Sequence, residues 1–298
     1  MTQGKTHREP LLRIAKRDGI ARPKAWAIRI IAVLLSLVVS GIFIFAVTKL
    51  NPFQVYEGIF DGAFGTPRRS WVTVRDAMML LCIGVGLAPC FKMRFWNIGA
   101  EGQILIGGFM RAFGGDISTP LLLVIMAVVS LLAGAAWGMV PATFKAVWNT
   151  NETLFTLMMN YVAIQLTSYF VALWENPVGF INQRTKDGWF PELFGQEYGL
   201  NVVLVLLLTV GMFLYLKYSK QGYEISVVGD SENTARYAGI NVKKVTIRTM
   251  AISGAICGLA GFIAVAGASH TISTSTAGGR GFTAIIVAWL AQFNTFVM

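Results

Sequence analysis

Five stretches of this chain contain no Asp, Glu, Lys or Arg, and each is 19 residues or longer. They are residues 30–48, 117–144, 154–174, 198–216 and 249–279. A bilayer crossing needs about 20 predominantly apolar residues, so each stretch is long enough to span a membrane. Only 13% of the 298 residues are charged, against roughly a quarter in soluble domains. The sequence therefore predicts an all-α polytopic membrane protein and excludes a soluble enzyme, a secreted disulfide scaffold and a nucleic-acid-binding domain.

The apolar pattern as a whole predicts eight crossings. They cover residues 28–47, 73–91, 95–113, 119–141, 154–174, 200–216, 247–268 and 280–298. The second is weak because it contains only 15 consecutive uncharged residues, and the third because it contains Glu101. Either segment can be a half-span or a re-entrant segment that the rest of the protein shields from lipid. The predicted organisation is a basic leader, residues 1–27, followed by a transmembrane domain, residues 28–298.

Lys and Arg residues predict the orientation of these crossings. Eight of them precede the first long apolar run, and others gather at residues 92–94, 145–153 and 217–246. Because cytoplasmic loops carry an excess of Lys and Arg, we expect these segments and the N-terminus to be cytoplasmic. The loop after the first crossing is an exception, with four basic residues. The net charge of +10 then reflects membrane topology and not a nucleic-acid partner.

Polar residues and glycines interrupt the third predicted crossing. The polar residues are Asn97, Glu101 and Gln103, and the glycines near its start are Gly99 and Gly102. A carboxylate at the centre of a span costs about 2.5–3.5 kcal/mol on insertion scales unless it is paired or faces water. One interpretation is a broken helix that lines a translocation pathway. The other is that Glu101, about 10 Å of helix rise beyond Arg94, braces a helix near the cytoplasmic interface.

Glycines also open the last predicted crossing, where Gly278, Gly279 and Gly281 follow a Ser/Thr-rich stretch. Crossings two and three and crossings seven and eight share this placement of glycine breaks. The two pairs are five crossings apart, so they point in opposite directions. This pattern predicts an inverted-topology repeat, although the two pairs share little residue-level similarity.

The segment at residues 217–246 is much longer than the usual connection of about four to six residues. Within it, Ser231 is a candidate N-cap, an acidic residue follows in the first turn, and Gly239 is a stop signal. These signals predict a short surface helix that docks into a partner, with a passive interfacial helix as the alternative. The predicted contact residues are Asp230, Glu232, Ala235, Arg236, Ala238 and Gly239.

Asn160 lies within the fifth predicted crossing, where it can contact a solute or hydrogen-bond a neighbouring helix. The sequence contains no G-x-x-x-x-G-K-[ST] phosphate loop, no H-E-x-x-H and no G-x-S-x-G, so these motifs provide no ATPase, metalloprotease or hydrolase chemistry. We predict no catalytic residue, no metal site and no cofactor. ATP-driven transport would therefore need a separate ATP-binding partner.

Residues 95–103 read FWNIGAEGQ, and this phrase resembles a signature of the permease subunits of bacterial ABC importers. The importers are those of the branched-chain amino acid and monosaccharide class, and the nearest likeness is to nucleoside permeases that work with basic-membrane-lipoprotein receptors. The resemblance covers about residues 75–298, and Thr295 departs from it because relatives usually have proline there. The segments that carry it are residues 95–108, 149–161, 229–242 and 279–296.

The resemblance implies a non-catalytic permease subunit in the bacterial plasma membrane that imports a small polar solute, by nearest likeness a nucleoside. It implies an ATP-binding subunit that docks at residues 222–245, a second permease subunit, identical or not, and an extracytoplasmic receptor lipoprotein. Membrane lipids surround the assembly, and no nucleic acid is expected. The alternative is an ion-coupled secondary transporter of a small polar solute, which the predicted repeat and Glu101 would also suit.

Overall fold

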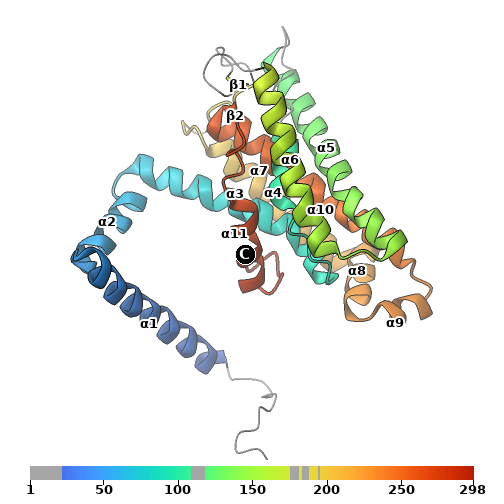
Figure 1. Ribbon diagram of the computed structural model, residues 1–298, viewed down its shortest axis with the longest axis horizontal. Coiled ribbons are helices and arrows are strands. Elements are labelled where there is room, and N and C mark those ends of the chain that lie inside the picture. The colour runs from blue at the N-terminus through green and yellow to red at the C-terminus, as the bar shows by residue number, and fades with distance from the viewer. Residues whose placement is uncertain (1–21, 109–117, 175–180, 183–187, 194) are drawn as a thin grey trace, which may run out of the picture. The chain divides into compact units, whose positions relative to one another are not determined.

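The computed structural model describes residues 22–108, 118–174, 181–182, 188–193 and 195–298. The chain divides into two compact units, Met1–Thr66 and Pro67–Met298. Each unit is described by itself. Helices account for nearly all the regular structure of the described residues (Figure 1).

The first unit contains two helices, α1 (Arg22–Thr48) and α2 (Pro52–Phe64). Helix α1 is a candidate membrane span over Trp26–Thr48. Helix α2 begins where the Asn51 side chain accepts a hydrogen bond from the Phe53 amide, which satisfies one of the free amides of a helix start. The Tyr56 hydroxyl donates to the Leu37 carbonyl at 2.6 Å and ties α2 to α1. Helix α2 was not predicted from the sequence.

The second unit holds the remaining elements, which are α3 (Pro67–Lys92), α4 (Ala100–Gly108), α5 (Thr119–Trp148), α6 (Glu152–Trp174), β1 (Ile181–Asn182), α7 (Gly199–Tyr218), α8 (Lys220–Asp230), α9 (Glu232–Tyr237), α10 (Val242–Ala264), the π-helix η2 (Val265–Ser269), β2 (Thr271–Ile272) and α11 (Arg280–Leu290). Strands β1 and β2 pair antiparallel. Helices α5 and α6 run beside each other along one side of the bundle (Figure 1).

The described residues contain six helices that are long and apolar enough to cross a membrane: α1, α3, α5, α6, α7, and α10 together with η2. The polytopic helical fold is confirmed. One of the eight predicted crossings contains a short helix instead, because α11 has 11 residues. The third was predicted over 95–113, where the structure describes α4 up to Gly108 and residues 109–113 lie outside the described residues. The second crossing is not a half-span, since α3 has 26 residues. The eighth, predicted over 280–298, ends as a helix at Leu290.

Helix α10 lies at the centre of the unit and packs against α3, α4 and α5. Its contact with α5 is lined by small residues, because Gly254 and Gly258 of α10 face Ser130 and Gly134 of α5. A Cβ atom placed on Gly258 would lie 3.0 Å from the Gly134 Cα. Small residues four apart let membrane helices approach this closely. The Ser130 hydroxyl also donates to the Gly107 carbonyl at 2.7 Å and so attaches α5 to α4.

Two pairs, each of a long and a short helix, are interleaved. Helix α4 follows α3 in the chain but packs on α10, whereas α11 follows α10 and packs on α3. The long helices α3 and α10 also contact each other. An inverted-topology repeat would produce this exchange of partners. The packing supports the predicted repeat, and the repeat itself stays a prediction.

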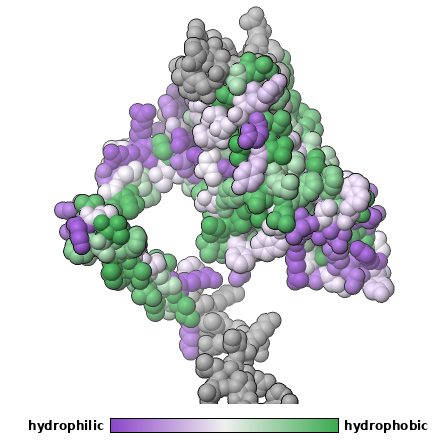
Figure 2. Space-filling model, in the orientation of Figure 1, coloured by the Kyte–Doolittle hydropathy of each residue, from purple (hydrophilic) through white to green (hydrophobic). Residues whose placement is uncertain are grey.

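Polar residues gather at the end of this unit that carries α8 and α9, and apolar residues cover the bundle beside them (Figure 2). A cleft at this end is lined by Arg94, Lys145 and Lys243, which come from three loops predicted to be cytoplasmic. Another cavity is lined by Glu192, Glu197 and His270, which come from two other connections between predicted crossings. The structure thus brings together the loops that the charge pattern assigns to one side. The orientation of the N-terminus stays a prediction.

Candidate functional site

Glu101 joins the starts of the two short helices. It lies in the first turn of α4 and is 7% exposed. One carboxylate oxygen, Oε1, accepts a hydrogen bond from the Gly279 amide at 2.6 Å, and Oε2 accepts from the Gly281 amide at 2.8 Å. These amides open α11, where helix geometry leaves the first N–H groups without an internal partner and creates a partial positive charge. The carboxylate therefore stabilises α11 from a position 178 residues earlier in the chain.

The predicted glycine breaks of α11 have two different roles. Gly278 and Gly279 adopt φ angles of +58° and +75°, a left-handed conformation that glycine takes without the Cβ clash of other residues. Gly281 lies inside the first turn of α11, where a Cβ atom would be 2.5 Å from the Glu101 amide nitrogen. The first two glycines form the break, whereas Gly281 permits the approach of α4.

Asn97 shapes the turn that leads into α4. Its Oδ1 accepts a hydrogen bond from the Gly99 amide at 3.0 Å, and its Nδ2 donates to the Ser253 hydroxyl of α10 at 3.3 Å. Asn97 and Gln103 also face each other, with amide contacts of 3.4 and 3.5 Å. Asn97 is 0% exposed and Gln103 is 1% exposed. This buried network holds the break before α4 against α10.

Asn160 of α6 clamps the same break from the other side. Its Oδ1 accepts from the Gly102 amide and its Nδ2 donates to the Ile98 carbonyl, both at 2.9 Å. Thr156 accepts from the Ile98 amide at 3.2 Å. Gly102 lies inside α4 and not at a break, because a Cβ atom there would sit 3.1 Å from the Asn160 Cα. Of the two interpretations of Asn160, the structure shows the hydrogen bond to a neighbouring segment.

The four residues predicted to lie on a translocation pathway are thus buried and bonded within the chain. Asn97, Glu101, Gln103 and Asn160 line none of the cavities described here. They satisfy the backbone groups that the two helix breaks expose. Their hydrogen bonds hold the starts of α4 and α11.

The ion pairs that join α3 to the start of α11 were not predicted from the sequence. Asp76 of α3 lies 3.0 Å from the Arg75 guanidinium and 3.3 Å from that of Arg280. The Asp76 and Arg280 side chains are 42% and 32% exposed. Because exposed charges are costly against hydrocarbon, this face of α3 and α11 requires water or protein beside it. Arg75 and Asp76 both lie in α3. Two adjacent charges inside the predicted second crossing were the available signal.

The predicted surface helix exists as α9. The Ser231 hydroxyl accepts from the Thr234 amide at 3.3 Å, and Gly239 ends the helix with a φ of +76°. Helix α8, which precedes it, was not predicted.

The predicted contact residues of this segment lie on different faces. Asp230, Glu232, Arg236, Ala238 and Gly239 are exposed. Ala235 is 0% exposed and packs into the core, so it anchors α9 and cannot itself touch a partner. Tyr237, which sequence reasoning missed, is 94% exposed. An aromatic residue in a short capped surface helix was the signal that could have identified it.

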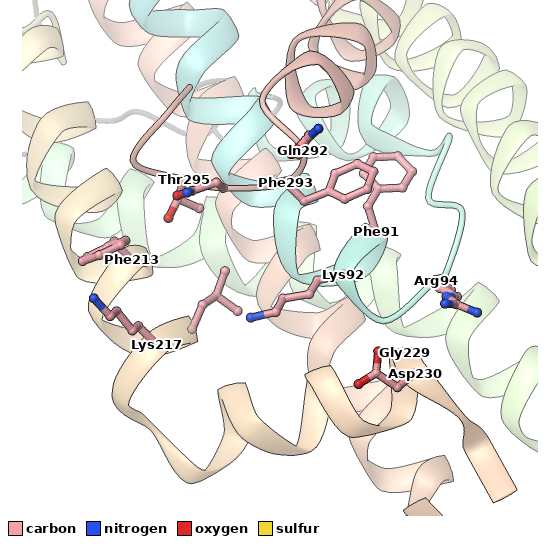
Figure 3. Close-up of a pocket in the computed structure, with 12 residues that line it drawn as sticks. Phe91, Lys92, Arg94, Phe213, Lys217, Gly229, Asp230, Gln292, Phe293 and Thr295 are labelled. Atoms are coloured by element: carbon pink, nitrogen blue, oxygen red, sulfur yellow. The ribbon is translucent and has the colours of Figure 1, made fainter. Parts of the chain in front are cut away.

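Two contacts fasten helix α8 to the bundle, one near its middle and one near its C-terminal end. Glu224 forms an ion pair of 2.8 Å with Arg248 of α10. Gly229 lies against the Lys92 carbonyl at the end of α3, and a Cβ atom there would be 3.2 Å from the Met93 Cα. Figure 3 shows Gly229 and Asp230 next to the turn that carries Arg94, at the edge of a cavity of about 530 Å³. A displacement of α8 and α9 would therefore be transmitted to α3 and α10.

Long apolar helices interleaved with two short helices, and a structured polar segment at one end, define a polytopic helical membrane protein. Residues 72–297 match the family described as "branched-chain amino acid transport system / permease component", and the chain belongs to this family.

Three relatives illustrate the membership. The chain is 30% identical over 283 residues to a guanosine ABC transporter permease protein of Bacillus subtilis (strain 168), covering 90% of this chain and 80% of that protein. It is 28% identical to a glucose ABC transporter permease protein of Haloferax volcanii, over 94% of this chain and 78% of that protein. It is 27% identical to a nucleoside ABC transporter permease protein of Lactococcus lactis subsp. cremoris, over 88% and 78%. No solved structure gives a significant match. The predicted class, an ABC transporter permease subunit, is confirmed.

Proposed function

We propose that this chain forms the translocation pathway of an ATP-driven importer of nucleosides. Two of the three relatives described above are named as guanosine or nucleoside permeases, which supports this solute over the glucose of the third. The chain itself breaks no bond, and a separate ATP-binding subunit hydrolyses ATP. The pathway lies between this subunit and a second permease subunit, identical or not.

The observation that carries the proposal is the contact between Glu101 and the start of α11. Broken helices whose ends meet inside a membrane expose backbone groups, and transporters tolerate these only where they line a cavity or are buried in protein. We infer that Asn97, Glu101, Gln103 and Asn160 hold the two breaks beside the pathway. The partly exposed Asp76–Arg280 pair marks the face that turns towards water and the second subunit.

The remaining partners follow from the ends of the bundle. The ATP-binding subunit docks at the α8–α9 segment within residues 217–246, and an extracytoplasmic receptor lipoprotein delivers the solute at the opposite end. The excess of Lys and Arg before the first crossing supports a cytoplasmic leader, residues 1–27, and the domain 28–298 then lies in the bacterial plasma membrane. When the ATP-binding subunits close, they displace α9, and the contacts of Gly229 and Glu224 pass this motion to α3 and α10. The solute site then alternates between its two access states.

The test is uptake of labelled guanosine by the reconstituted importer, with and without ATP on the cytoplasmic side. We expect uptake that requires ATP and survives an ionophore, and that unlabelled glucose does not reduce. An ion-coupled transporter would give the reverse, because its uptake collapses with the ionophore and ignores ATP. Uptake that persists after inactivation of the partner ATPase would refute the proposal.

A further inference from the structure

A cleft of about 330 Å³ lies beside α9. Three segments that are distant in the chain form its walls: the turn between α3 and α4, the turn between α5 and α6, and the stretch from α9 into α10. All three belong to the end that the charge pattern predicts to be cytoplasmic. In the proposed function, α9 is the docking site for the ATP-binding subunit, but this cleft has no role.

The cleft carries an excess of positive charge. Its lining includes two carboxylates, and each already has a cation, since Glu152 lies 3.0 Å from Lys145 and Glu232 lies 3.5 Å from Arg236. Arg94 and Lys243 also line the cleft and are exposed. Among the residues that the structure describes, neither forms a salt bridge. Two cations are therefore left to meet a ligand.

The walls are preformed by turns with unusual backbone conformations. Arg94 and Asn149 both line the cleft and have positive φ angles, of 60° and 53°. A left-handed conformation costs a non-glycine residue roughly 1–2 kcal/mol, so it persists only where the surrounding structure fixes it. The two turns are thus held in place before any ligand arrives.

The floor of the cleft leads directly to the helix breaks. Met93 and Phe95 line it and are 6% and 5% exposed. Asn97, which holds the start of α4, follows two residues later. A group bound in the cleft would therefore touch α9 and the turn that precedes α4 at the same time.

We propose that this cleft receives a carboxylate-bearing segment of the ATP-binding subunit, as a second docking point beside α9. The inference rests on the proposed function. Two unpaired cations among internally paired charges suit an isolated acidic side chain of a protein partner. Every residue of α9 except Ala235 is exposed, and the position beside α9 puts the cleft within the surface that such a subunit would cover. Binding there would let ATP-driven motion act on α4 directly as well as through α8.

Adjacent lysines provide a matched test. Lys243 lines the cleft, whereas Lys244 is exposed but does not line it. Both occupy the first turn of α10, where a glutamate favours the helix dipole, so neither substitution should impair folding. The binding of the purified ATP-binding subunit is measured on the complete permease assembly in nanodiscs of zwitterionic lipid and of anionic lipid. We expect Lys243→Glu to raise Kd about tenfold in both lipids and Lys244→Glu to change it less than about twofold.

Equal effects of the two substitutions would overturn the docking point while leaving the proposed function intact. An effect of Lys243→Glu in anionic lipid alone would also overturn it, because the cleft would then hold a lipid headgroup. If the wild-type permease assembly failed to bind the ATP-binding subunit at all, the proposed function itself would be wrong. Lys243→Gln, which removes the charge without reversing it, should give a smaller increase than Lys243→Glu.

Discussion

Replacing Glu101 with glutamine tests whether α4 and α11 are held together as one unit. The carboxylate accepts two backbone hydrogen bonds, at 2.6 and 2.8 Å, from the start of α11. Hydrogen bonds to a charged acceptor contribute about 1.5–3 kcal/mol each. Glutamine can accept from one of the two amides through its neutral carbonyl oxygen, but its NH₂ group is a donor and cannot accept from the other. We therefore expect Glu101→Gln to destabilise the fold by about 2–4 kcal/mol.

The assay pairs thermal unfolding of the purified assembly with ATP-driven uptake. By the scaling of soluble domains, a loss of this size lowers Tm by about 4–8 °C. Uptake should fall at temperatures where the protein remains folded, because the start of α11 loses its position. Glu57→Gln is the control, since Glu57 is an exposed carboxylate of α2 and should leave both readouts unchanged. Unaltered Tm and uptake in Glu101→Gln would reduce Glu101 to a solvated residue and refute the reasoning.

Three further changes test other contacts. Asn160→Leu leaves the Gly102 amide and the Ile98 carbonyl without their partner; we expect a loss of about 2–4 kcal/mol, and an unchanged Tm would contradict the clamp. Gly258→Ala forces a Cβ atom against α5 and should cost about 1–3 kcal/mol in the same assay, whereas Gly211→Ala, which meets nothing within 4 Å, should be neutral. Proline cannot adopt the φ of +76° found at Gly239. Gly239→Pro should therefore weaken binding of the ATP-binding subunit about tenfold or more while the membrane spans stay folded. Normal co-purification of the two subunits would show that α9 is not part of the docking surface.

Local sequence signals were sufficient for the long helices and for α9. Charge-free runs identify five of the six long apolar helices, because length and hydropathy are properties of the segment itself. Ser231 and Gly239 bound α9 for the same reason, since capping involves neighbouring residues. Helix α3 is harder to identify because Arg75 and Asp76 lie within it, and their tolerance depends on Arg280 of a remote helix.

The tertiary contacts of α4 and α11 were beyond sequence reasoning because they join segments that are far apart in the chain. Glycine content predicted that breaks exist, but Gly102 and Gly281 lie inside helices where another segment passes close by. The two interpretations of Glu101 could not be separated, because its hydrogen-bond donors lie near residue 280. The burial of Ala235 could not be predicted either, because a six-residue helix is too short for its apolar periodicity to show which face is buried.

The contacts from α9 to α11 form one continuous path. Helix α8 reaches the end of α3 through Gly229, and the next residues of the chain, 93–97, lead into the capped start of α4. Glu101, four residues beyond Asn97, holds the start of α11. A displacement applied at α9 would therefore reach both short helices through a turn and the two hydrogen bonds that the Gly279 and Gly281 amides donate to the Glu101 carboxylate. Because Glu101 belongs to the first turn of α4 and also holds the start of α11, the two helices should move together. In each access state the two helix breaks should therefore be either both in place or both displaced.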